Sequence, residues 1–199
     1  MKKQVIAAVA LAAATLVSGT AYAQAADGPW LVRLRAVHLD STNSDSTPLG
    51  LSINNKTLPE LDISYFVSKN IAVELMLTVP QEQTLSSNGV AIGTLKHLPP
   101  AVLLQYHFEM PGYKPYVGAG INYTRFSAVN LTVPGADIDR NSFGAALQVG
   151  VDIPLSRNVY LNFDVKKVYI STNVTLNGAT IGSFKIDPLL VGVGLGWRF

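Results

Sequence analysis

The sequence predicts an all-β protein, an eight-stranded antiparallel transmembrane β-barrel with short periplasmic turns and longer extracellular loops. Three observations lead to this prediction. The chain begins with a secretory signal, it contains few charged residues, and apolar residues alternate with small or polar ones in eight segments. A barrel wall needs this period of two residues because one face meets lipid and the other meets the lumen.

The first 23 residues have the three parts of a cleaved signal peptide. Lys2 and Lys3 give a basic start, residues 5–17 form an apolar run, and residues 21–23 supply an A-x-A cleavage site. The run is too short to span a bilayer of about 30 Å. We therefore expect residues 1–23 to be removed and residues 24–199 to form a single outer-membrane barrel domain.

Composition excludes several classes of protein. Charged residues make up 14% of the chain, against about 25% in soluble domains. Removal of Lys2 and Lys3 leaves 13 basic and 13 acidic residues, and this balance predicts no nucleic-acid partner. The absence of cysteine excludes disulfide scaffolds, thiolate metal sites and cysteine nucleophiles.

The expected strands are defined by their alternation. In the first, Val32 and Leu34 fall on the lipid face while Arg33 falls on the lumen face. In the last, aliphatic residues alternate with glycines up to the terminal Phe199. The eight expected strands are residues 30–39, 57–66, 71–79, 101–109, 116–126, 142–153, 159–169 and 186–199.

The connections between these strands alternate in length. Residues 67–70, 110–115 and 154–158 are short turns, whereas residues 40–56, 80–100, 127–141 and 170–185 are expected to be long loops. Short periplasmic turns, longer external loops and an even strand count are typical of barrels in the bacterial outer membrane. Aromatic residues then fall at both edges of the lipid face, as girdles do.

The lumen-facing residues near the periplasm form a mixed-charge set. An eight-stranded barrel is only wide enough for side chains to fill it, and buried charges persist when they are paired. We therefore expect a polar plug in which Arg33 or Arg35 pairs with Glu60 or Asp62. The full predicted plug is Arg33, Arg35, Glu60, Asp62, Glu74, Gln105, His107, Gln148, Asp152, Asp164 and Arg198.

The lumen-facing residues near the outside are apolar. Ordinary core packing of a closed barrel is one interpretation, and a path for an apolar ligand is the other. The expected loops 89–95 and 174–184 are also apolar, which favours a ligand path. The predicted channel lining is Val37, Leu39, Leu58, Met76, Leu103, Phe126, Val168, Ile170, Ile186 and Leu190.

Prolines interrupt the wall above the predicted plug. Proline cannot donate a ladder hydrogen bond, so prolines near the outer ends of the strands predict a lateral opening through which an apolar molecule passes into lipid. The residues in question are Pro59, Pro99, Pro100 and Pro188. The alternative is that these prolines simply end strands at loops.

Enzymatic and cofactor sites lack support in the sequence. His38, His97 and His107 are scattered, with His97 expected in a loop, and no histidine cluster or Glu-x-x-His helix suggests a metal. A lipid-modifying enzyme would need a base beside a nucleophile. A soluble β-sandwich or lipocalin-like barrel would place the many small residues of the lumen face in water. We expect no enzyme and no cofactor.

Several segments resemble the outer-membrane protein W (OmpW) family, which includes alkane-uptake relatives. They are NIAVEL at 70–75, HLPP at 97–100, PYVGAGINYT at 115–124, QVGVD at 148–152, Asp187-Pro188 and the terminal WRF. The resemblance implies an outer-membrane barrel for passive uptake of small hydrophobic molecules, closed toward the periplasm. It also implies that barrel assembly machinery reads Trp197 and Phe199 as a signal. The third external loop, residues 127–141, is shorter than in the family, which leaves the shape of the vestibule open.

The partners expected from these observations are small hydrophobic molecules, outer-membrane lipids and the assembly machinery. A non-transporting structural or receptor barrel remains the alternative, since it would have the same wall but a fully packed mouth.

Overall fold

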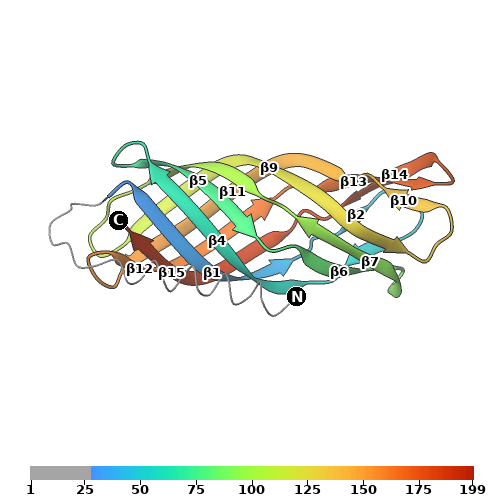
Figure 1. The fold of residues 1–199 in the computed structure, drawn as a ribbon, viewed down its shortest axis with the longest axis horizontal. Coiled ribbons are helices and arrows are strands. Elements are labelled where there is room, and N and C mark those ends of the chain that lie inside the picture. Colours follow the sequence, from blue (N-terminus) through green and yellow to red (C-terminus); the bar gives the residue numbers. More distant parts are fainter. Residues whose placement is uncertain (1–27) are drawn as a thin grey trace.

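Residues 28–199 form a closed antiparallel barrel in the computed structural model (Figure 1). Each strand pairs with the next, and the last pairs with the first, so the wall has no free edge at its centre. The eight strands of the wall are β1 (Trp30–Asp40), β4 (Lys56–Phe66), β5 (Ile71–Thr78), β8 (Ala101–His107), β9 (Lys114–Leu131), β11 (Asn141–Pro154), β12 (Val159–Val168) and β15 (Leu189–Arg198). This confirms the predicted fold. The expected signal peptide, residues 1–23, lies outside the described residues.

Alternation of side chains produces the two faces of the wall. Along β1, Leu31, Arg33 and Val37 are buried in the lumen, while Trp30 and Leu34 are exposed on the outside. The outer face is a belt of exposed apolar residues, among them Val73, Leu75, Val102, Leu104, Val117, Ile121, Val149, Val191, Val193 and Leu195. Such a belt suits a hydrocarbon environment. Within residues 28–199, no helix is long and apolar enough to cross a membrane.

Aromatic rings mark both edges of this belt. Trp30 and Tyr65 lie edge to face at the end with the short turns, with ring centroids 4.8 Å apart. Tyr123 and Phe143 lie at the opposite end, also 4.8 Å apart. We call the end with the short turns and Phe199 the periplasmic end, and the other the extracellular end.

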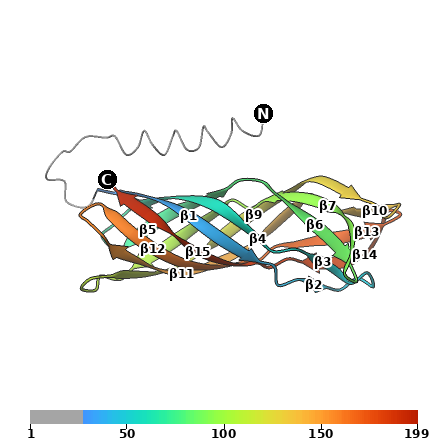
Figure 2. The same ribbon diagram turned by 90° about the horizontal axis from the view of Figure 1, so that it is seen from below.

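The extracellular connections differ from the expected loops because strands fill most of them (Figure 2). They contain β2 (Ser44–Asp45), β3 (Leu51–Ile53), β6 (Gln81–Ser87), β7 (Val90–Leu98), β10 (Ala136–Ile138), β13 (Ser171–Leu176) and β14 (Ala179–Lys185). Tight Asn-Gly turns form the hairpins, since Asn88, Gly89, Asn177 and Gly178 all have positive φ angles. The wall therefore continues beyond the membrane belt as β-structure.

The β6–β7 hairpin continues one side of the barrel. β7 pairs with the upper part of β9 where β8 stops, and β6 pairs with β7 and β3. A second sheet, in the order β10-β13-β14-β2, forms the other side. His97 lies in β7 and is 1% exposed, so its predicted position in a loop was wrong.

The two ends of the wall meet at Phe199. Its backbone N–H donates to the Trp30 carbonyl at 2.9 Å, and the Trp30 N–H donates to the Phe199 carbonyl at 3.0 Å. The terminal residue thus closes the ladder between β15 and β1.

Candidate functional site

An ion network fills the periplasmic half of the lumen. Arg33 on β1 reaches across to β11, where its Nε and Nη2 contact Asp152 Oδ1 and Oδ2 at 3.1 and 2.6 Å. Its Nη1 contacts Glu74 Oε2 at 2.9 Å and donates to Ser64 Oγ at 3.0 Å. The side chains of Arg33 and Glu74 are fully buried, so this pairing replaces their hydration.

Arg35 forms the second centre of the network. Its Nε lies 3.2 Å from Glu60 Oε1, its Nη2 contacts Asp62, and its Nη1 lies 3.1 Å from Asp164 Oδ2. The predicted pairing of an arginine on the first strand with Glu60 or Asp62 is confirmed for Arg35. Arg33 instead forms ion pairs with Glu74 and Asp152.

Two members of the network were missed by the sequence reasoning. Lys166 Nζ lies 2.7 Å from Glu60 Oε1 and 2.8 Å from Asp164 Oδ1, and Tyr116 Oη donates to Asp164 Oδ2 at 2.7 Å. Lys166 has the same phase on its strand as Asp164 and Val168, so the alternation already contained this signal. Tyr116 is likewise inward-facing at the start of the expected fifth strand.

Amide groups join three more of the predicted plug residues, but not Arg198. Gln105 Nε2 donates to Gln148 Oε1 at 2.8 Å, and Gln148 Nε2 donates to Glu74 Oε1 at 2.9 Å. His107 Nε2 lies 3.0 Å from Gln105 Oε1. Arg198 lies apart from this network at the periplasmic rim, half-buried, with its guanidinium 3.9 Å from the centre of the Phe66 ring.

Buried carboxyl groups outnumber buried cations in the network. Three cations, Arg33, Arg35 and Lys166, face five carboxyl groups, those of Glu60, Asp62, Glu74, Asp152 and Asp164. Glu60 Oε2 and Asp62 Oδ1 are buried without a hydrogen-bond partner. Both atoms belong to the upper part of the network, next to the apolar residues.

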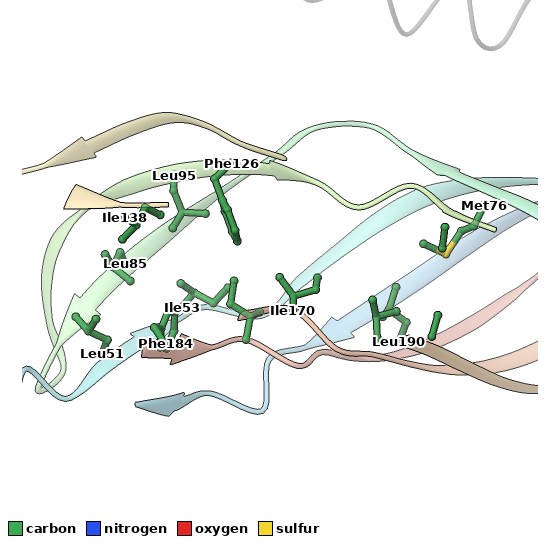
Figure 3. Packing of buried hydrophobic residues seen from close by; sticks show 14 of the residues in the cluster. Leu51, Ile53, Met76, Leu85, Leu95, Phe126, Ile138, Ile170, Phe184 and Leu190 are labelled. Carbon is green, nitrogen blue, oxygen red and sulfur yellow. The ribbon is translucent and has the colours of Figure 1, made fainter. Parts of the chain in front are cut away.

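Above the network, most inward-facing side chains are apolar, although Asn122, Thr124, Ser142 and Thr172 are buried there too. We call this space, between the network and the extracellular end, the upper lumen. All ten predicted lining residues are buried, at most 4% exposed, and all but Leu39 and Leu58 belong to one apolar cluster. Figure 3 shows Met76 and Leu190 at one end of the cluster and Leu51, Leu85 and Phe184 at the other.

The extracellular strands contribute buried apolar residues beyond the ten of the predicted lining. They are Leu51, Ile53, Leu85, Leu95, Ile138, Val174 and Phe184. Inward and outward residues alternate within 81–87 and 171–176, although the sequence analysis expects both segments to be loops. The apolar interior is therefore longer than expected.

The four predicted prolines differ in how the strands beside them are hydrogen-bonded. The carbonyls of Pro100 and Pro188 accept the N–H groups of Tyr123 and Val168, each at 3.1 Å, so hydrogen bonds cross the wall at both places. Pro59 lies on β4 opposite Ala36 of β1. On its other side, the β4–β5 ladder of the described residues ends at Glu60 and Thr78, one residue below Pro59. Pro99 is buried between β7 and β8.

The histidines are not gathered into one site. His38 is exposed and contacts Thr57 Oγ1 at 3.0 Å, His107 belongs to the plug, and His97 lies beside Phe126 in the upper lumen. In the part of the chain that the structure describes, no group of three or more His, Asp or Glu residues is arranged to hold a metal ion.

Comparisons with known proteins agree with this architecture. The OmpW family model matches residues 31–199. An outer-membrane protein of Sinorhizobium fredii, y4mB, is 40% identical over 86% of this chain and 80% of its own. Outer membrane protein W of Escherichia coli is 34% identical over the full length of both chains. Outer membrane protein AlkL of Ectopseudomonas oleovorans is 31% identical over 75% of this chain and 69% of its own.

Solved structures of two of these proteins have the same fold. The solution structure of E. coli outer membrane protein W superposes with a TM-score of 0.67 at 30% identity, covering 88% of this chain and all of that one. The structure of AlkL in lipid bilayers gives a TM-score of 0.70 at 25% identity, covering 92% and 96% of the two chains.

Proposed function

Because the chain belongs to the OmpW family and is therefore an outer-membrane β-barrel, we propose that it is a channel for the passive uptake of small hydrophobic molecules. In this proposal, the solute enters the upper lumen from outside, meets the ion network and leaves sideways into the membrane. The resemblance to AlkL and the apolar upper lumen support the choice of solute.

One observation supports the route most strongly. On four strands, a charged inward residue is followed two positions toward the outside by an apolar one: Arg35 by Val37, Glu60 by Leu58, Glu74 by Met76, and Lys166 by Val168. The lumen therefore changes from ionic to apolar across one level. An apolar solute above that level gains nothing by entering the plug, since it would displace paired charges.

The lateral exit is proposed between β4 and the β5–β6 segment. Ladder pairing on this side of β4 ends at Glu60, and Pro59 adds no N–H donor there. Pro80, between β5 and β6, is a second residue without a donor close to this edge. The prolines at 99, 100 and 188 support the opening less, because the carbonyls of Pro100 and Pro188 are bonded across the wall.

The proposal includes two further partners. Lipid surrounds the exposed apolar belt, and barrel assembly machinery reads the terminal strand through Trp197 and Phe199. The backbone exchange between Phe199 and Trp30 supports a role of the terminus in closing the barrel. We propose no catalytic activity and no cofactor.

Full burial of the ten lining residues favours a second candidate function. A structural or receptor barrel with a packed mouth would bury them in the same way. In the channel proposal, the same side chains separate when a solute enters. An uptake measurement therefore decides between the two functions.

The test is Met76→Lys, compared with Met76→Leu. Met76 is the cross-strand partner of Asp62, whose Oδ1 is buried without a hydrogen-bond partner, so a lysine there has a carboxylate to pair with and the barrel should still fold. We expect uptake of radiolabelled n-octane to fall severalfold in Met76→Lys cells and to be retained in Met76→Leu cells, at equal amounts of folded barrel. Equal uptake in both would favour the structural or receptor barrel.

A further inference from the structure

The β6–β7 hairpin contributes two buried polar atoms that have no hydrogen-bond partner. They are Gln83 Oε1 on β6 and His97 Nδ1 on β7, and each residue is 1% exposed. A buried polar group without a partner is costly, because it has lost its hydrogen bonds to water and gained none in the protein. Leucine at position 83 would avoid this cost in an apolar surrounding, so the two polar groups need an explanation.

The two side chains are neighbours on one face of the hairpin. In the β6–β7 register, Gln83 lies opposite Leu95 and Gln81 lies opposite His97, which makes Gln83 and His97 diagonal neighbours on the inward face. Long side chains reach each other across such a diagonal. The surroundings are apolar, with Leu85 and Leu95 in the cluster and the Phe126 ring 6.3 Å from the imidazole.

A hydrogen bond of the Gln83 side chain determines which of its atoms is available to a ligand. Its Nε2 donates to the Asn54 carbonyl at 2.5 Å, so the amide nitrogen points to the wall and Oε1 is left as an acceptor. Ser41 Oγ, which is also buried without a partner, adjoins the same turn because the Ser41 N–H donates to Asn55 Oδ1 at 3.0 Å. Gln83 Oε1 is therefore an acceptor without a donor in a mainly apolar part of the wall.

The imidazole is neutral under ordinary conditions. Burial lowers the pKa of His97, which lies on the extracellular hairpin, to about 4. A neutral imidazole nitrogen either donates or accepts according to its tautomer. With Nδ1 protonated, the pair offers one donor beside one acceptor.

We propose that Gln83 and His97 form a binding site for the hydroxyl group of uncharged, otherwise apolar molecules, such as aliphatic alcohols. The ligand's O–H donates to Gln83 Oε1, and its oxygen accepts from His97 Nδ1. An alkane leaves both groups unpaired. A carboxylate has no hydrogen to donate to Gln83 Oε1, and its negative charge would be repelled by that oxygen. This inference rests on the proposed function, because it assumes that apolar solutes reach the upper lumen.

The test is made on the full barrel in lipid nanodiscs, with n-octanol, n-octane and octanoate as probes. The chemical shift of the His97 ring nitrogen reports binding directly. We expect n-octanol to shift this signal saturably, and n-octane and octanoate to leave it nearly unchanged. Gln83→Leu should weaken the n-octanol effect about three- to tenfold, the loss of one hydrogen bond.

Thr84→Val is the matched control, because Thr84 is exposed on the outward face of the same strand. It should bind n-octanol as the parent does. Equal responses to n-octanol and n-octane, or an unchanged response in Gln83→Leu, would overturn the hydroxyl site. A nitrogen signal that already shows a hydrogen bond and ignores n-octanol would assign the pair to bound water instead.

The nanodisc measurement needs no transport, so it separates the two proposals. Binding of n-octanol at His97 without n-octane uptake by cells would support the hydroxyl site and contradict the channel. Uptake of n-octane by cells without an n-octanol preference at His97 would support the channel and contradict the hydroxyl site.

Discussion

Arg33 and Asp152 are 119 positions apart in the chain, yet the guanidinium of one meets both carboxylate oxygens of the other across the lumen, at 3.1 and 2.6 Å. This contact joins β1 to β11, two strands that are not neighbours in the wall. The lumen is therefore bridged at this level. Any molecule that passes from end to end would have to break it.

The first prediction concerns the stability that this contact gives. Asp152→Ala leaves Arg33 with fewer partners in a buried position, and loss of one partner of a buried pair typically costs about 3 to 5 kcal/mol. We expect a lower denaturant midpoint for the refolded barrel in lipid vesicles. Asp137→Ala is the control, because the Asp137–Arg140 pair is exposed and such pairs contribute about 0 to 1 kcal/mol. Equal effects of the two substitutions would contradict the buried network.

A second prediction is that the barrel conducts ions poorly. The network between Arg33, Arg35 and Lys166 and their carboxylates fills the narrow lumen. Planar-bilayer recordings of the parent protein should lack the large steady conductance of a water-filled porin. A conductance of porin size would show that the plug does not close the lumen.

The third prediction concerns the terminal residue. Deletion of Phe199 removes the backbone exchange with Trp30 and the proposed assembly signal, so outer-membrane levels of folded protein should drop sharply. Phe199→Tyr keeps the ring and the backbone and should be assembled normally. Heat-modifiable, folded protein at parent levels after the deletion would refute this role.

A fourth prediction follows from the buried imidazole of His97. Its pKa is lowered to about 4, so an unfolded chain takes up this proton near pH 6.5 while the folded protein does not until about pH 4. More protons are then bound in the unfolded state, and the free energy of unfolding should fall as the pH falls from about 6.5 to about 4. His97→Phe should lack this part of the pH dependence. Identical slopes in parent and variant would contradict the buried, neutral state.

Much of the fold could be predicted because the barrel wall imposes a period of two residues on each strand. Arg33 on the lumen face and Leu34 on the lipid face follow from alternation alone. The position of the plug followed from the same phase, once short turns had fixed the periplasmic end. Local patterns thus determined which side chains face inward.

The partners inside the lumen could not be predicted in the same way. Which carboxylate meets Arg33 depends on the tilt and register of strands that are far apart in the chain, and the structure joins it to Asp152 rather than to the neighbouring Asp62. Lys166 was overlooked although its phase was inward. Strands stand in place of the expected external loops because Asn88-Gly89 and Asn177-Gly178 form tight hairpin turns between them.

The central claim is that apolar solutes leave the upper lumen sideways beside β4, and a disulfide across that edge tests it most directly. The natural chain has no cysteine, so a variant with Pro59→Cys and Val79→Cys carries one cysteine pair. These two positions follow Glu60 and Thr78, the last ladder pair between β4 and β5, toward the extracellular end. Ala36→Cys with Val193→Cys, across the paired β1–β15 seam, is the control. We predict that oxidation of the first pair stops n-octane uptake and reduction restores it, while the control pair has no effect. Unchanged uptake with the β4 edge locked would contradict the lateral exit.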